Sequence, residues 1–130
     1  MSKPADFDQC VFVNCPFDAP YKPLLWALIF SILAYGYKPC SALQEQDAGA
    51  VRLDKIKRLI GNSRLGIHDI SRIETDTVLG LPRFNMPFEL GLDVGARAYG
   101  RGYLATKQIL SSLDFNDFHY FAKGWIALNA

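Results

Sequence analysis

The sequence predicts an α/β fold of the flavodoxin-like (Rossmann-like) kind, a three-layer domain with a mostly parallel sheet of four or five strands. Two observations predict it. Short β-branched and aromatic runs alternate along the chain with longer helical patterns, which is typical of βαβ units. The first of these runs, residues 10–14, is apolar up to its last residue, as expected of a central strand that is buried on both faces.

Length and charge limit what the chain can be. Its 130 residues, half of them hydrophobic, suffice for one domain with a working core, and no linker or repeat divides them. The formal net charge of +1 produces no long-range attraction to nucleic acid or to an anionic membrane. The longest apolar run, residues 24–35, is shorter than the about 20 residues that cross a bilayer. We therefore expect a cytoplasmic protein with no membrane partner.

The cysteines point to the same compartment. Cys10, Cys15 and Cys40 are odd in number, and no pair has the Cys-x-x-Cys spacing. Reduced thiols of a cytoplasmic protein are the best interpretation, so neither a disulfide nor a metal site is expected. No glycine-rich phosphate loop occurs either, and we expect no bound cofactor.

In the first half of the chain we expect a loose lead-in over residues 1–9 and then the strand at 10–14. The prolines Pro16 and Pro20 predict a loop, and residues 21–35 predict a helix that ends at Gly36. That helix is apolar nearly all round, which predicts deep packing. The residues expected in its core contacts are Leu25, Leu28, Ile29 and Ile32.

In the second half we expect a weak strand at 38–43 and a polar loop at 44–49. An amphipathic helix follows at 51–60, with its apolar side formed by Val51, Ile56, Leu59 and Ile60. Residues 65–70 predict the next strand, residues 74–81 a polar loop, and residues 103–110 a fourth strand. Beyond residue 113 the pattern is weak, but the segment carries Phe115, Phe118, Tyr120, Phe121 and Trp125, which favours self-association.

A further helix is predicted from Pro87 to about Tyr99. Pro87 suits a first helical turn, and Asn85 is a good cap ahead of it. Glu89 would then lie in the first turn, where the helix dipole favours an ionised carboxylate. Small residues recur at helical spacing and predict a smooth stripe that packs closely on the sheet; they are Gly91, Gly95 and Ala98.

Polar residues follow the predicted strands at one edge of the sheet. Because parallel strands end at the same edge, we expect residues 14–18, 68–72 and 85–89 to meet there. They would bring together two carboxylates, Glu89 and Asp69, and the donors Asn14, Asn85, Arg72 and Arg83. Two carboxylates across a cleft can cleave a glycosidic bond, one by attacking or stabilising C1′ and one by handling the proton of the leaving group. Burial would raise the pKa of Asp69 for the second role.

Each of these residues also has a purely structural interpretation. Asp69 could cap a loop, and Glu89 could complement the helix dipole. Asp93, one turn after Glu89, is interpreted as solvated, and His68 as a packed or hydrogen-bonded histidine rather than a metal ligand. Phe17 and Tyr21 could stack on a base or belong to the core.

Three segments carry a resemblance to a known family. They are FVNCPF at 12–17, IHDISR at 67–72 and PRFNMPFELG at 82–91. Together they resemble small bacterial proteins that are similar to nucleoside 2-deoxyribosyltransferases and, more distantly, to TIR domains. Related domains are effectors of anti-phage systems, including retron-associated ones. The resemblance covers residues 10–100, whereas residues 101–130 form a divergent tail.

The resemblance implies that Glu89 is the nucleophile that forms a sugar intermediate, and that Asp69 matches the acidic residue after the third strand. The transferases usually carry an Asp six residues before that Glu, where this chain has Arg83. The resemblance implies cleavage of the N-glycosidic bond of a nucleoside, a nucleotide or NAD, by hydrolysis or transfer, with Asn14, Phe17, Arg72, Arg83 and Asn85 as substrate contacts. The alternative is a non-catalytic nucleotide-sensing or protein-interaction module of the same fold. With either function, the chain could form a homo-oligomer or bind a partner protein of a defence system.

Overall fold

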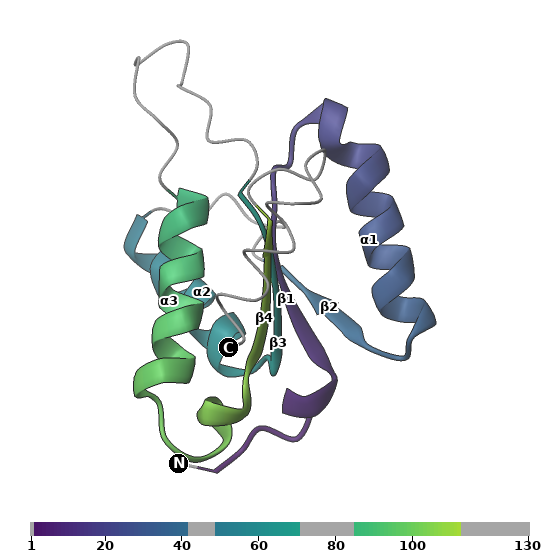
Figure 1. The fold of residues 1–130 in the computed structure, drawn as a ribbon. Coiled ribbons are helices and arrows are strands. Elements are labelled where there is room, and N and C mark those ends of the chain that lie inside the picture. The colour runs from purple at the N-terminus through teal and green to yellow at the C-terminus, as the bar shows by residue number, and fades with distance from the viewer. Residues whose placement is uncertain (1, 42–48, 71–84, 113–130) are drawn as a thin grey trace.

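The computed structural model describes residues 2–41, 49–70 and 85–112, which form a four-stranded, all-parallel sheet with the order β2-β1-β3-β4 (Figure 1). The elements in chain order are β1 (Cys10–Asn14), α1 (Lys22–Ala34), β2 (Lys38–Cys40), α2 (Gly49–Gly61), β3 (Leu65–Asp69), α3 (Asn85–Tyr99) and β4 (Gln108–Ser112). The predicted α/β fold with a parallel sheet is confirmed, and so is the interior position of β1.

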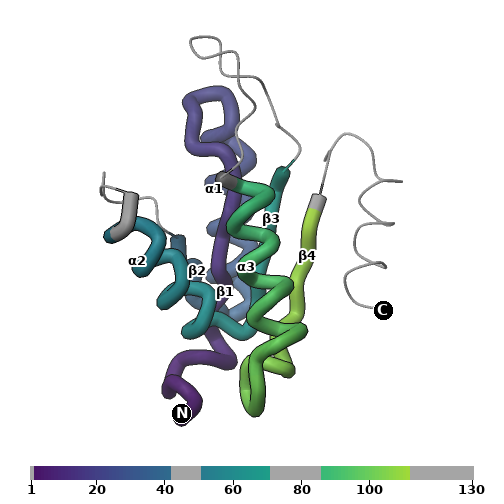
Figure 2. The backbone as a smooth tube through the Cα atoms, turned by 90° about the vertical axis from the view of Figure 1, so that its left-hand side faces the viewer, coloured from purple at the N-terminus to yellow at the C-terminus, as the bar shows by residue number. Residues whose placement is uncertain are grey.

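Helices cover both faces of the sheet. α1 lies on one face, while α2 and α3 lie side by side on the other (Figures 1 and 2). All five residues of β1 are buried, and their side chains alternate between the two layers. Val11 and Val13 pack in a cluster with Ile32 of α1, whereas Phe12 packs with Ile56 and Ile60 of α2. These two clusters are the core of the three-layer, flavodoxin-like arrangement.

The position of α1 agrees with the prediction, but the predicted deep burial is wrong. Ile32 is the buried residue of α1; Leu25 and Leu28 are partly buried, and so is Ile29. On the outer face Trp26 is 66% exposed, Phe30 72% and Leu33 57%. A single helix on a sheet can bury only the stripe that faces the sheet, so a helix that is apolar all round must expose the rest.

The α2 segment also departs from the prediction in detail. The helix begins at Gly49, and Val51 is exposed although its spacing predicted the apolar side. Ile56 and Ile60 are buried as predicted. The strand expected at 38–43 is observed as Lys38–Cys40. Residues 42–48 and the predicted loop at 74–81 lie outside the described residues.

The N-terminal segment packs against the segment that precedes β4. Phe7 is fully buried in a short 3-10 helix (Phe7–Gln9), so this part of the expected loose lead-in is packed. Its ring lies edge-on to Tyr103 with centroids 4.9 Å apart. Tyr103 belongs to another 3-10 helix (Gly102–Thr106), which replaces the first half of the strand predicted at 103–110. Among the described helices, none combines the length and apolar character that crossing a bilayer requires.

Candidate functional site

The carboxyl edge of the sheet brings together the ends of β1 and β3 and the start of α3. Asn14 is the last residue of β1, and Asp69 is the last residue of β3. The Nδ2 of Asn14 donates a hydrogen bond of 2.9 Å to the carbonyl oxygen of Met86, in the first turn of α3. The predicted meeting of these three segments is therefore confirmed for their described residues.

Two carboxylates are buried at this edge. Asp69 is 1% exposed, and its Oδ2 accepts a hydrogen bond of 2.6 Å from the hydroxyl of Tyr21. Glu89 is 6% exposed, and its Oε1 lies 3.9 Å from Nη2 of Arg52 on α2. Since α3 begins at Asn85, Glu89 lies in the second helical turn, and the predicted first-turn position is wrong.

Burial changes the protonation of Glu89. It raises the pKa of the carboxyl to about 7, and the positive charge of Arg52 opposes this rise only in part. The expectation that the helix dipole keeps Glu89 ionised is therefore wrong: the effect of the dipole is confined to the first turn, Glu89 lies beyond it, and burial favours the neutral carboxyl. At pH 7 the carboxyl is present in both its charged and its neutral form.

Cys15, the residue that follows β1, is buried. Burial raises the pKa of its thiol to about 12, and the negative charges of Asp69 and Glu89 add to the rise. A thiol with this pKa stays protonated at neutral pH and is no nucleophile.

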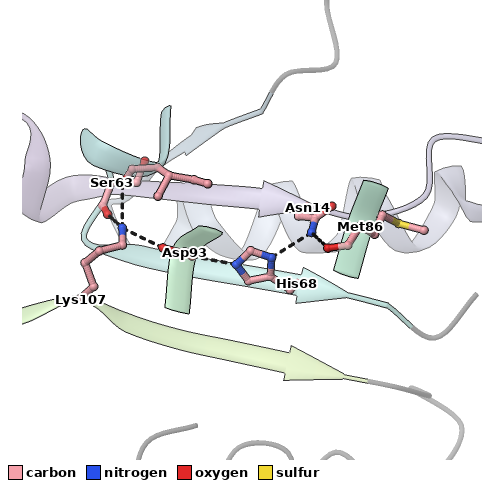
Figure 3. A network of polar contacts seen from close by, with 7 residues as sticks. Asn14, Ser63, His68, Met86, Asp93 and Lys107 are labelled. Carbon is pink, nitrogen blue, oxygen red and sulfur yellow. Dashed lines mark hydrogen bonds and ion pairs between the residues drawn. The ribbon is translucent and has the colours of Figure 1, made fainter. Parts of the chain in front are cut away.

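A second cluster of polar side chains runs beneath α3, from Asn14 through His68 and Asp93 to Lys107 (Figure 3). Nδ1 of His68 lies 2.9 Å from Nδ2 of Asn14, and Nε2 of His68 lies 2.7 Å from Oδ2 of Asp93. His68 and Asp93 are both fully buried. The interpretation of His68 as a hydrogen-bonded histidine is confirmed, whereas the interpretation of Asp93 as solvated is wrong.

Lys107 ends this polar chain just before β4. Its Nζ forms an ion pair of 3.1 Å with Oδ1 of Asp93 and donates to the carbonyl oxygens of Ile60, at 2.7 Å, and of Ser63. Burial lowers the pKa of Lys107, and the carboxylate of Asp93 opposes that change. The ammonium also complements the carbonyl groups at the C-terminal end of α2, where the helix dipole is negative.

The packing of α3 differs from the predicted small-residue stripe. A Cβ on Gly91 or Gly95 would meet nothing within 4 Å, so these residues do not carry the contact with the sheet. Leu92, Asp93 and Ala96 do. Asp93 lies four residues after Glu89 and therefore on the same side of the helix, so both carboxyl groups belong to its buried face.

The remaining predicted contacts are only partly described. Phe17 follows β1 and is 41% exposed. Arg72, Arg83 and the side chain of Asn85 lie outside the described residues, as do His119 and the aromatic residues beyond 112. In residues 2–41, 49–70 and 85–112, no group of three or more His, Cys, Asp and Glu side chains is arranged to hold a metal ion.

Comparison with protein-family models and with curated protein sequences gives no match for this chain. Two carboxyl groups and an amide side chain converge at the carboxyl edge of a parallel sheet, which is where α/β folds of this kind bind ligands. Buried carboxyl groups of this kind can stabilise a developing positive charge and exchange a proton.

Proposed function

We propose that this protein cleaves the N-glycosidic bond of a nucleoside, a nucleotide or NAD, by hydrolysis or transfer. One observation carries the proposal: two carboxyl groups are buried at the carboxyl side of the sheet, Asp69 at the end of β3 and Glu89 near the start of α3. The resemblance of the three sequence segments to the deoxyribosyltransferases supports the same chemistry and extends it to bacterial anti-phage defence.

In the proposed reaction the bond from C1′ to the base nitrogen breaks, and its electron pair leaves with the base. The carboxylate of Glu89 attacks C1′ or stabilises its oxocarbenium character. Asp69 delivers a proton to the departing base, and then accepts one from the water or acceptor that completes the reaction. Tyr21 positions Asp69 through its 2.6 Å hydrogen bond. Asn14, Phe17, Arg72, Arg83 and Asn85 are the proposed substrate contacts.

A non-catalytic module that binds a nucleotide is the second candidate. The observation that favours it is the pKa of about 7 for Glu89, because the neutral carboxyl cannot attack C1′. Such a module would hold its ligand at the same edge without turnover, and its affinity would change little in Glu89→Gln.

The test is incubation of the purified protein with a panel of nucleosides, nucleotides and NAD, followed by chromatography for free base. Wild type should release base from at least one member, and Glu89→Gln should release orders of magnitude less. Asp54→Asn is the matched control because Asp54 is an exposed carboxylate on the outer side of α2. If Glu89→Gln were as active as wild type, Glu89 would be excluded as the nucleophile. Binding of a nucleotide without turnover in wild type would favour the non-catalytic module.

A further inference from the structure

We propose that Asp93 and Lys107 hold His68 as the neutral Nε2–H tautomer, and that His68 in turn orients Asn14 so that only its carbonyl oxygen can meet a ligand. Asn14 would then recognise a hydroxyl group of the sugar. The recognition of a sugar hydroxyl by Asn14 rests on the proposed function, whereas the tautomer of His68 does not.

The orientation of Asn14 follows from its two partners. The carbonyl oxygen of Met86 can only accept, so the atom of Asn14 that lies 2.9 Å from it must be the amide nitrogen. That nitrogen carries two hydrogens, and its other neighbour, at 2.9 Å, is Nδ1 of His68. One hydrogen serves each partner. The remaining polar atom of the Asn14 side chain is Oδ1, which can only accept.

The tautomer of His68 follows in the same way. Because Asn14 donates to Nδ1, that ring nitrogen must carry a lone pair and no hydrogen. The ring proton is then on Nε2, which donates to Oδ2 of Asp93 at 2.7 Å. A neutral ring with its hydrogen on Nε2 satisfies both contacts, whereas the opposite tautomer would satisfy neither.

Asp93 can impose this arrangement because it is itself held. Its other oxygen, Oδ1, lies 3.1 Å from the ammonium of Lys107, and all three side chains are buried. Gly66 leaves the space for the carboxylate: a Cβ at this position would lie 2.0 Å from Oδ2 of Asp93. One oxygen of Asp93 thus faces the ammonium of Lys107, and the other accepts the hydrogen bond from Nε2 of His68.

These contacts run without a break from the start of β4 to the end of β1 (Figure 3). The charges lie at one end and Asn14 lies at the ligand edge, beside Asp69 at the end of the neighbouring strand. Asp93 and Lys107 are thus positioning residues that act through His68. The ligand group that pairs with the accepting oxygen of Asn14 must be a donor, and the donors of a nucleoside sugar are its hydroxyls.

Nuclear magnetic resonance tests the tautomer directly. The chain has two histidines, so a 15N-labelled His119→Gln protein contains His68 alone. Its imidazole correlations at pH 7.5 should show an unprotonated Nδ1 and a protonated Nε2. A protonated Nδ1, alone or together with a protonated Nε2, would overturn the inference.

The role of Asp93 is tested in the same protein with Asp93→Asn added. An amide can donate to Nε2 as well as accept from it, so the constraint at Nε2 is removed while the one from Asn14 at Nδ1 remains. The form with the hydrogen on Nδ1 should then become detectable beside the Nε2–H form. A pattern identical to that with Asp93 present would show that this residue does not set the tautomer. If the double variant fails to fold, the measurement on His119→Gln still decides which tautomer the native network holds.

A matched pair of variants tests the link to the ligand. The amide nitrogen of Gln can replace Nε2, so His68→Gln keeps a donor to Asp93 and loses the contact with Asn14. The shorter side chain in His68→Asn keeps an acceptor for Asn14 and loses the donor to Asp93. The probes are 2′-deoxyadenosine and its 2′,3′- and 2′,5′-dideoxy analogues, each of which lacks one hydroxyl. In wild type, kcat/KM for one of the two analogues should be about tenfold lower than for 2′-deoxyadenosine, the usual effect of losing one hydrogen bond.

That difference should disappear in His68→Gln and persist in His68→Asn. An equal difference in wild type and His68→Gln, or no difference between the probes in wild type, would overturn the role of Asn14. Absence of base release from the whole substrate panel would instead refute the proposed function, and the tautomer measurement would be unaffected.

Discussion

At the scale of the single residue, the burial of Glu89 determines how its carboxyl responds to pH. Its pKa is about 7 in the folded protein and near 4.5 when it is exposed to water. Between these values the folded state binds a proton that the unfolded state does not bind. The contribution of this group to stability is therefore complete below pH 4.5 and is lost as the pH rises through 7.

Glu89→Gln removes this loss, because the amide is never charged. We expect the variant to be more stable than wild type at pH 8 by about 1–3 kcal/mol, and to be close to wild type at pH 5. Urea unfolding at the two pH values measures it, with Asp54→Asn as an exposed control that should stay within about 0.5 kcal/mol at both. A Glu89→Gln protein that is less stable than wild type at pH 8 would contradict the burial argument.

The same pKa predicts the pH dependence of the proposed reaction. A nucleophilic Glu89 must be ionised, so base release by wild type should rise with pH and level off above about 7. If Glu89 instead donates the proton, the rate should fall over the same range. Initial rates from pH 5.5 to 8.5 decide the direction, and a fall would exchange the roles proposed for Glu89 and Asp69.

At the scale of the element, the packing of α3 on β3 depends on a glycine. Gly66→Ala would place a Cβ 2.0 Å from the carboxylate of Asp93, and we expect a destabilisation of about 1–3 kcal/mol from this overpacking. Gly91→Ala is the matched control, because its Cβ meets nothing within 4 Å and alanine favours a helix by about 0.5–1 kcal/mol. Thermal melts compare them, and equal melting temperatures would refute the close contact.

The contact of α1 with the sheet can be tested with neighbouring residues of the helix. Ile32 is buried in the cluster with Val11 and Val13, so Ile32→Ala should cost about 2–5 kcal/mol. Leu33, the next residue, is exposed, and Leu33→Ala should cost less than about 0.5 kcal/mol when the protein is dilute enough to be monomeric. Denaturant unfolding measures both changes. A similar loss in the two variants would mean that α1 is covered on both sides.

At the scale of the whole molecule, the outer face of α1 exposes a group of large apolar side chains. It is formed by Trp26, Phe30 and Leu33, which lie on one side of the helix, and no charged residue occurs between Lys22 and Lys38. The sequence had suggested residues 115–125 as the interface, and these lie outside the described residues. The exposed face of α1 provides a separate reason to expect self-association.

We therefore expect wild type to associate at tens of micromolar, as measured by light scattering. Phe30→Lys should shift the mass toward the monomer, because a charge would be buried in the contact. Val51→Lys introduces the same charge at an exposed position on α2, in the opposite layer, and should leave the mass unchanged. A monomeric wild type, or equal effects of the two variants, would refute an interface on α1.

The fold and half of the site could be predicted because both depend on local patterns. Alternating strand and helix signals placed β1 in the interior, and the parallel order then placed Asn14 and Asp69 at one edge. The polar chain under α3 could not be predicted in this way. Asp93 and Lys107 are 14 residues apart, and Lys107 precedes β4 after a 3-10 helix that no periodic pattern announces.

By itself, the sequence determined the class of fold, the order of its elements and the edge where the carboxylates gather, since hydrophobic periodicity and the direction of parallel strands are enough for these. Only the tertiary structure decided which apolar and charged residues are removed from water. That removal depends on what packs against each face: α1 has a partner on one side only, whereas Glu89, Asp93 and Lys107 are enclosed by segments distant in sequence. The raised pKa of Glu89 and the pairing of His68 both follow from this enclosure.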